Sequence, residues 1–355
     1  MIPTLYKMKQ AFRLLMILTI FAMLGSCTDI DGDGTDTDIW EGSDLPEATS
    51  YRNPVWEPDM SRPAVIRGAT QFYAFGDEKE WSPGLSYTVP VLRSTNLMEW
   101  TITGEAFETS PEWAEGSITS VSGIFSKTLG TYYMAFTIGD DGIGISSSKA
   151  PQGPYYDYGK LIDKDAGGFD FVREPFLIQT GLSFYLFFET DQGIYGTELT
   201  IGRNVAPVLK GDLFKIAGTN FDAVYVFRKE SDDYYIFGTV GDESQSKIYM
   251  GRSIDIKGPY LDQDGNDLTE SQGTLLLEED AQNGFEAPGH VGGIFTDKYD
   301  NDWIMYHAVD IDKPELSSGA DRRPLMLSPI VWDENGWPAE VIKAKGGWNS
   351  PKFEF

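Results

Sequence analysis

The sequence predicts an all-β protein with the fold of a five-bladed β-propeller, and two observations support this prediction. Helical periodicity is almost absent, and the chain consists of short alternating runs rich in Tyr, Phe, Val and Ile, separated by Gly, Pro, Asp and Ser. Such alternation is typical of β-strands. The second observation is an aromatic run that recurs along the chain. The runs start at Phe72, Tyr132, Phe184, Tyr234 and Trp303.

Each aromatic run lies in a similar setting, and this setting defines a repeat. The starts of the runs are 60, 52, 50 and 69 residues apart. An apolar strand and a turn precede each run, as in "RPAVIR" and "SGIFSK", and a strand with Gly, Ser or Arg follows it, as in "VPVLRST" and "GIGISSS". A repeat of this length that forms one small antiparallel sheet indicates a propeller blade. We therefore expect the aromatic runs to form the cores of five blades.

Residues 1–26 resemble the signal peptide of a bacterial lipoprotein. Two lysines and an arginine precede an apolar run of eleven residues, 14–24, which is too short to span a bilayer. The segment "LGSC" ends at Cys27, the single cysteine of the chain. In lipoproteins this cysteine carries the lipid, so we expect an outer membrane or cell surface lipoprotein of a Gram-negative bacterium. An ordinary signal peptide with an unrelated cysteine is the alternative.

Composition separates a tether from the folded domain and excludes some partners. Residues 27–50 are acidic and Gly-rich, as expected for a flexible tether, and residues 51–355 form the predicted propeller. The net charge of −27 argues against binding of nucleic acid or of polyanionic substrates, because it would repel both. A neutral polysaccharide or oligosaccharide is not penalised. We expect the protein to be a monomer.

A ring of charged residues is predicted at the centre of the propeller. The innermost strand of each blade begins near the central channel, and counting back ten to thirteen residues from each aromatic run gives the residue that opens it. Two carboxylates, a histidine and an arginine in one funnel indicate a site, because buried charges require partners. The predicted opening positions are Arg62, the stretch Ser120 to Ser122, Glu174, Asp222 and His290.

From Asn53 to about Pro338 the chain resembles glycoside hydrolase family 43, especially its arabinanase-like members with five blades. "NPVWEPDMSRPAVIR" looks like the opening strand of the family, and "GIGISSSKAPQGPYYDYGKLI" resembles its second blade. The most specific match is "APGHVGGIFTDKYDNDWIMYHA" followed by "RPLMLSPIVWDENGWP", which is similar to the last blade. The resemblance implies a plant polysaccharide of the arabinan or arabinoxylan class as the ligand or substrate.

The resemblance also implies a mechanism with three carboxylates. In the family, an Asp of the first blade is the general base, an Asp of the third blade tunes the site, and a Glu of the fourth blade is the general acid. One carboxylate deprotonates water on one face of the sugar while a carboxylic acid protonates the leaving oxygen on the other face. The third carboxylate keeps the acid protonated through its negative charge.

All three catalytic positions differ from the family pattern. Arg62 stands at the base position, and a guanidinium cannot accept a proton. Asp59 lies three residues earlier and is not an obvious substitute. Glu174 stands at the position of the tuning Asp, and Asp222 stands at the position of the acid Glu. The opening of the second blade is replaced by "SITSVS", residues 117–122, without an acid.

His290 matches the histidine of the family's last blade. In relatives it helps to hold a calcium or sodium ion through waters, so the resemblance implies a possible ion near His290. Calcium, however, prefers carboxylate and carbonyl ligands to imidazole.

Two functions remain open at this stage. The first is glycan binding with little or no hydrolysis, since the loss of a general base removes roughly 10²–10⁴-fold in rate. The second is an active glycosidase of arabinosidase or xylosidase type, with Glu174 and Asp222 as the carboxylate pair and Arg62 bound to an acidic or oxygen-rich part of the substrate. The sequence favours the first. Aromatic rings that stack on sugars would line the rim, and the candidates are Trp56, Trp81, Trp113 and Tyr225.

Overall fold

The computed structural model describes residues 50–139, 142–203, 205–229, 233–344 and 348–355. The predicted signal peptide, the lipidation site at Cys27 and nearly all of the predicted tether lie outside these residues. The described residues belong to one compact unit, Ala48–Phe355. No helix in these ranges is long and apolar enough to cross a membrane.

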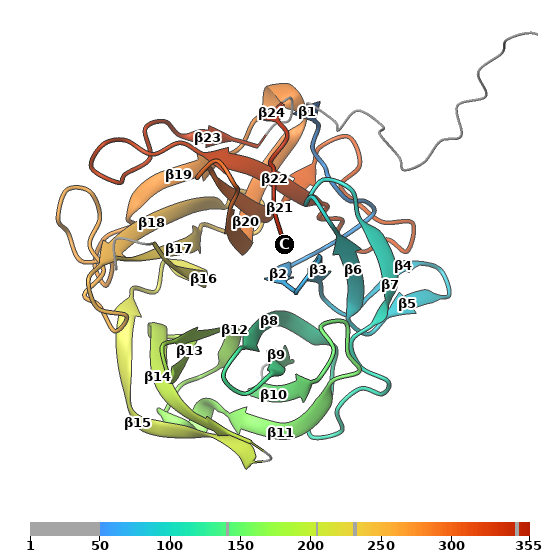
Figure 1. Cartoon of the computed structure of the whole chain (residues 1–355), viewed down its shortest axis with the longest axis vertical. Coiled ribbons are helices and arrows are strands. Elements are labelled where there is room, and N and C mark those ends of the chain that lie inside the picture. The colour runs from blue at the N-terminus through green and yellow to red at the C-terminus, as the bar shows by residue number, and fades with distance from the viewer. Residues whose placement is uncertain (1–49, 140–141, 204, 230–232, 345–347) are drawn as a thin grey trace, which may run out of the picture. The chain divides into compact units, whose positions relative to one another are not determined.

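Five sheets surround a common centre, as the propeller prediction required (Figure 1). Their strands pair antiparallel except for the outermost pair of the fourth sheet, which is parallel. The innermost strands contact one another in a closed ring, in which the fifth strand again meets the first. These five inner strands are β2 (Ala64–Arg67), β8 (Ile118–Ser126), β12 (Val172–Thr180), β16 (Phe221–Arg228) and β20 (Phe285–Thr296).

The second strand of every blade contains one of the predicted aromatic runs and is almost entirely buried. These strands are buried on both faces because they pack between neighbouring blades, which explains why they read as continuous aromatic and aliphatic runs. The prediction that the runs form blade cores is confirmed. The second strands are β3 (Phe72–Phe75), β9 (Thr131–Ile138), β13 (Ser183–Thr190), β17 (Tyr234–Val240) and β21 (Asp302–Asp310).

The blades differ in their number of strands, from three in the last blade to five in the fourth. Two short pairs lie outside the blades: β1 with β24 and β4 with β5. Two short 3-10 helices, η1 (Lys164–Ala166) and η2 (Ala281–Asn283), connect strands. The remaining strands are β1 (Ser50–Tyr51), β4 (Lys79–Ser82), β5 (Leu85–Tyr87), β6 (Pro90–Ser94), β7 (Thr101–Glu105), β10 (Ile143–Ser148), β11 (Tyr156–Ile162), β14 (Gly193–Gly202), β15 (Val205–Ala217), β18 (Lys247–Ser253), β19 (Thr274–Glu278), β22 (Leu325–Ile330), β23 (Ile342–Lys343) and β24 (Trp348–Asn349).

The first residues of the domain close the ring by pairing with the last blade. β1 is antiparallel to β24, and Val55 N–H donates to the Leu325 carbonyl at 2.9 Å. The Asn53 amide both donates to the carbonyl and accepts from the N–H of Leu327, each at 2.9 Å. The segment therefore runs beside β22 at the open edge of the three-stranded blade, and it links the beginning and the end of the propeller.

A local irregularity at the start of the inner strands turns side chains toward the centre. β8, β12, β16 and β20 each shift register near the predicted opening residue, as in β-bulges, which often lie next to active sites. The left-handed backbone conformation found at these openings is unfavourable for residues other than Gly and is characteristic of functional sites. It is adopted by Arg62, Ser120, Glu174 and His290, with φ between 45° and 52°.

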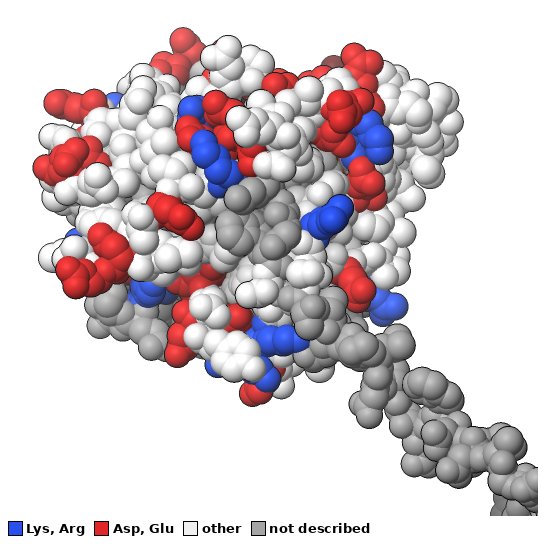
Figure 2. Space-filling model, turned by 90° about the horizontal axis from the view of Figure 1, so that it is seen from above, with Lys and Arg blue, Asp and Glu red and all other residues white. Residues whose placement is uncertain are grey.

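The surface carries the excess of negative charge expected from the composition. Figure 2 shows one face of the molecule, on which acidic side chains are scattered and are interspersed with fewer basic ones.

Candidate active site

Two cavities meet at the inner strands. A channel of about 250 Å³ is lined largely by apolar side chains of these strands. A second cavity of about 240 Å³ is lined mainly by polar residues, including Asp222, Glu243 and Arg323. Arg62 and His290 line both cavities, so the predicted charged ring lies where the apolar channel meets the polar cavity. We call the polar cavity the mouth.

Arg62 is held by two buried carboxylates. Its Nη1 donates to Asp77 Oδ2 at 2.7 Å. Its Nε lies 3.0 Å from Glu174 Oε1, but the N–H is not directed at that oxygen, so this contact is an ion pair without a hydrogen bond. Burial alone would lower the pKa of Arg62, but the charges of Glu174 and Asp77 raise it above its usual value. Arg62 is therefore a fixed cation.

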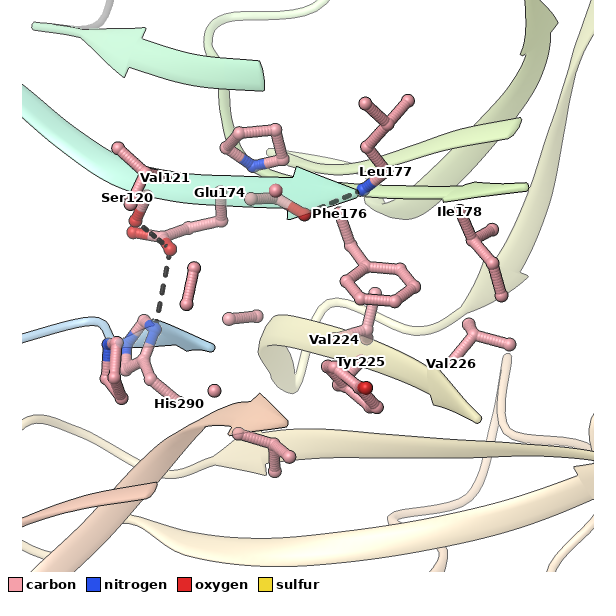
Figure 3. A pocket seen from close by; sticks show the side chains of 18 of the residues that line it. Ser120, Val121, Glu174, Phe176, Leu177, Ile178, Val224, Tyr225, Val226 and His290 are labelled. Carbon is pink, nitrogen blue, oxygen red and sulfur yellow. Dashed lines mark hydrogen bonds and ion pairs between the residues drawn. The ribbon is translucent and has the colours of Figure 1, made fainter. Parts of the chain in front are cut away.

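Glu174 lies at the centre of the ring (Figure 3). Its Oε2 accepts a short hydrogen bond from the Ser120 hydroxyl, and the same oxygen is 3.5 Å from His290 Nδ1. The side chain is only 7% exposed. Glu174 thus has charged or hydrogen-bonding partners from three other blades.

Asp222 faces the mouth and lies 3.5 Å from His290 Nε2, measured from Oδ2. Its Oδ1 is 3.9 Å from Arg173 Nη2. Burial alone would raise the pKa of Asp222, but His290, a hydrogen bond with Glu189 and the charge of Arg173 together lower it well below its usual value. Asp222 is therefore ionised at neutral pH, which is the wrong state for a general acid.

Glu189 carries the proton in this part of the site. It accepts hydrogen bonds from Arg173 Nε at 2.8 Å and Nη2 at 3.0 Å, and it shares a hydrogen bond with Asp222. Burial and the charge of Asp222 raise the pKa of Glu189 to about 9 despite Arg173. Two carboxyl groups that share a hydrogen bond need one proton between them, and His290, which lies beside Asp222, favours the charge on Asp222.

The chain's sequence matches the model of glycosyl hydrolases family 43 over residues 51–338. The chain belongs to this family. It is 24% identical over 319 residues to the extracellular exo-α-(1→5)-L-arabinofuranosidase ArbA of Cellvibrio japonicus, covering 79% of this chain and 86% of the relative. It is also 24% identical over 299 residues to the extracellular endo-α-(1→5)-L-arabinanase 1 of Bacillus subtilis, covering 78% of this chain and 86% of the relative.

A solved arabinanase structure has the same fold. The α-L-arabinanase of Cellvibrio cellulosa complexed with arabinohexaose superimposes with a TM-score of 0.65 at 20% sequence identity, covering 80% of this chain and 95% of the arabinanase. At this identity the likeness shows the fold alone.

The structure thus brings together the strand-opening positions predicted from the sequence. Arg62, Glu174, Asp222 and His290 form one chain of contacts, and Ser120 joins them through its hydroxyl. The catalytic roles implied by the resemblance remain predictions, because the contacts place the side chains without assigning a step to any of them.

Asp59 is a structural residue in this arrangement. It is 1% exposed and accepts hydrogen bonds from the Ser61 N–H at 3.1 Å and the Arg323 N–H at 2.7 Å. Lys79 Nζ lies 3.4 Å from its Oδ2. Because these partners occupy its oxygens and it is sealed from both cavities, Asp59 has no access to a water at the mouth.

Three of the predicted rim aromatics lie away from the ring. Trp56 and Trp81 lie together, with ring centroids 6.3 Å apart, and Trp81 borders a shallow groove with residues such as Leu316. Trp113 packs on Phe136, with centroids 6.0 Å apart. None of the three tryptophans is among the described residues that line the channel or the mouth, so their position offers no support for sugar stacking at the centre.

Tyr225 lines the channel (Figure 3). Its ring packs against Phe176, with centroids 4.7 Å apart, and its hydroxyl accepts from the Ile294 N–H at 3.3 Å. Tyr225 therefore contributes to packing between inner strands. Binding of sugar by this residue stays a prediction.

The ion predicted near His290 also stays a prediction. Both imidazole nitrogens face carboxylates, Glu174 and Asp222. Within the described ranges, no group of three or more His, Cys, Asp or Glu side chains is arranged to hold a metal. The described residues around His290 therefore offer no ready set of direct metal ligands.

Several functional candidates were missed because they lie on the second strands. Asp77, Glu189 and Thr239 each lie five residues after the first residue of an aromatic run, and His307 lies four residues after. Each of the four contacts an opening residue or its neighbour. The sequence carries a signal for them, since a polar residue at the end of a buried apolar strand requires a partner. The repeat therefore contains two polar positions, one on each of the two inner strands.

His307 illustrates this second polar position. It is 4% exposed, and its Nδ1 accepts from the Arg62 N–H at 3.0 Å. Burial, together with the charge of His290 and of nearby cations, lowers the pKa of His307 well below its usual value. The neutral imidazole is the form that can accept this bond, so His307 fixes the unusual backbone of Arg62.

Proposed function

We propose that this family 43 protein recognises a plant-type polysaccharide of the arabinan or arabinoxylan class and hydrolyses it little or not at all. The observation that carries the proposal is the guanidinium of Arg62. It is fixed between Asp77 and Glu174 at the position where the family resemblance requires a proton acceptor. Despite its burial, Asp222 has a pKa that His290, Glu189 and Arg173 lower, which removes the proton donor as well. Both halves of an inverting mechanism are therefore opposed.

The test measures hydrolysis and binding in the same preparations. Release of reducing sugar from arabinan and arabino-oligosaccharides should be at most a trace, while calorimetric titration with the same oligosaccharides should show binding. Arg62→Asp combined with Asp222→Glu should recover measurable hydrolysis. The matched control is Arg62→Ala with Asp222→Glu, which removes the cation but supplies no base. Full activity of the natural protein, undiminished by Arg62→Ala, would contradict the proposal.

An active glycosidase is the second candidate, and one observation favours it. Glu243 lines the mouth together with Asp222, and its exposed carboxylate lies 3.6 Å from Arg62 Nη2. Glu243 would then be the general base and would act together with Asp222. It would replace Glu174 in the predicted carboxylate pair, since Glu174 is buried among partners. In that case Glu243→Gln would abolish hydrolysis of a neutral substrate by the natural protein.

The N-terminal sequence, with the segment LGSC, supports the proposed location at the membrane. The protein is a monomer held at the outer membrane or cell surface by a lipid on Cys27, with the mouth open to polysaccharide. Cys27→Ala should release soluble protein into the periplasm or the medium. An unchanged membrane fraction would refute the anchor, and sizing of the released protein by light scattering tests the monomer.

A further inference from the structure

The mouth contains a feature that glycan binding in general does not require: two arginines face one exposed carboxylate. Arg62 Nη2 lies 3.6 Å from Glu243 Oε1, and Arg323 Nη2 lies 3.9 Å from Glu243 Oε2. Both distances exceed those of hydrogen bonds. The Glu243 side chain is 71% exposed, and ion pairs of this exposed kind contribute little to stability. The arginines thus approach a carboxylate that they do not hold firmly.

Both arginines are fixed independently of that carboxylate. Arg62 is anchored by Asp77 and Glu174 through Nη1 and Nε, which leaves Nη2 directed at the mouth. The backbone N–H of Arg323 donates to the buried Asp59, and its side chain is only 12% exposed. Pre-organised guanidinium groups lose little freedom on binding and match the planar geometry of a carboxylate.

Glu243, in contrast, lies on the turn between β17 and β18. Its carbonyl accepts from Arg323 Nη2 at 3.1 Å, and Asp242 braces the same turn by accepting from the Ser244 N–H at 3.0 Å. The backbone of the turn is therefore held in place while the carboxylate of Glu243 is free to rotate into solvent. A ligand carboxylate could replace it without moving the turn.

We propose that Arg62 and Arg323 form a subsite for the carboxylate of a single acidic sugar unit, such as a uronosyl group, and that Glu243 occupies this subsite in the free protein. The inference rests on the proposed glycan binding and adds the chemistry of one unit. The mouth, at about 240 Å³, is smaller than a typical ligand pocket of about 300–1,000 Å³, so it accepts one sugar unit and not a length of polymer.

The overall charge agrees with a single acidic unit better than with a polyanion. A net charge of −27 repels a long anionic chain. That repulsion is screened over about 10 Å at moderate salt, whereas the two guanidinium groups act within the mouth itself. A largely neutral polysaccharide that carries occasional acidic units satisfies both conditions.

The test compares three probes of the same length: a xylo-oligosaccharide with one glucuronosyl group, the same compound with that carboxylate converted to an amide, and the unsubstituted xylo-oligosaccharide. Calorimetric titration of the natural protein should show the tightest binding for the acidic probe. Arg323→Gln should weaken binding of the acidic probe by about tenfold and should weaken binding of the two neutral probes much less. Glu243→Gln should strengthen binding of the acidic probe, because it removes the internal competitor. Glu270→Gln, at an exposed position on another loop, is the matched control and should have no effect.

The outcomes separate this inference from the proposed function. Equal affinity for all three probes would overturn the acidic subsite while leaving glycan binding intact. Weaker binding of the acidic probe by Glu243→Gln would also overturn it, because Glu243 would then contact the sugar instead of competing with it. Loss of hydrolysis without a change in affinity in Glu243→Gln would identify Glu243 as a base. Failure of every probe to bind would refute both proposals.

Discussion

The two sides of the mouth use the same residue types in opposite ways. On one side Arg62 separates two buried carboxylates, Asp77 and Glu174. On the other side Arg173 lies beside Glu189 and Asp222, which also contact each other. Where the guanidinium stands between the carboxylates, burial raises the pKa of Asp77 above its usual value, and the charge of Arg62 offsets only part of that rise. Where the carboxylates meet, one proton is retained, and it resides on Glu189 behind Asp222.

This difference shows that a proton can be present in a site without being available to a substrate. Glu189 is 9% exposed, whereas Asp222 is 30% exposed and lines the mouth. The group with the raised pKa is therefore the buried one, and the group that faces a ligand is ionised. An arrangement of this kind favours binding over acid catalysis.

The largest expected effect is on the free energy of unfolding, and it differs between substitutions of Arg62 and of Arg173. Arg62→Ala would leave Asp77 and Glu174 buried without their cation, so we expect a loss of about 3 kcal/mol in the free energy of unfolding. Arg173→Ala should cost about 1 kcal/mol, because Arg173 is 41% exposed and its partner Glu189 is protonated. Urea unfolding at neutral pH measures both. Equal losses would show that the two sides are equivalent. Arg62→Lys, which keeps the charge but cannot bridge two carboxylates, is the control.

The second prediction concerns pH and tests the proton on Glu189. Because its folded-state pKa is about 9 and lies above the unfolded value of about 4.5, the folded protein binds one more proton than the unfolded chain between these values. Stability should then fall as pH rises through this window, by at most about 1.4 kcal/mol per pH unit.

Glu189→Gln keeps the shape of the protonated carboxyl but does not titrate. The free energy of unfolding of this variant should exceed that of the natural protein by a difference that grows from about pH 5 and reaches about 2 kcal/mol by pH 8. This difference is smaller than the linkage limit, because hydration and rearrangement partly relieve a buried charge. Parallel urea titrations across this range provide the measurement. A constant difference between the two proteins would place the proton elsewhere.

The smallest expected effect concerns the backbone at Ser120. Its φ of 49° is unfavourable for a residue with a Cβ, so Ser120→Gly should be about 0.5–1 kcal/mol more stable than Ser120→Ala, after allowing for the larger entropy of Gly in the unfolded chain. Both variants lose the hydroxyl bonded to Glu174, so their difference isolates the backbone. The same pair of substitutions at Asp222, which is not among the residues with positive φ, should not favour Gly.

The sequence predicts the fold and the ring because both depend on the repeat. Five aromatic runs identify the second strands, and counting back from them reaches Arg62, Glu174 and His290. The sequence does not predict the positions of Trp56, Trp81 and Trp113, because aromatic residues occur both in hydrophobic cores and at the rims of binding sites. Glu243 could not be predicted, because an acidic residue in a turn has no pattern that ties it to a distant arginine. Asp77 and Glu189 carried a usable signal, an acid at the end of a buried strand.

The pairing of the first residues with β22 and β24 has a consequence for synthesis. The residues that run beside β22 belong to the segment that leaves the ribosome before all five blades. Four blades can form in order as the chain emerges, but the ring cannot be sealed until β22 and then β24 have appeared. The pairing of the first residues with β22 and β24 is thus the last contact to form, and it joins the parts of the domain that are synthesised first and last. A chain that ends before Leu325 would leave its first residues without this partner.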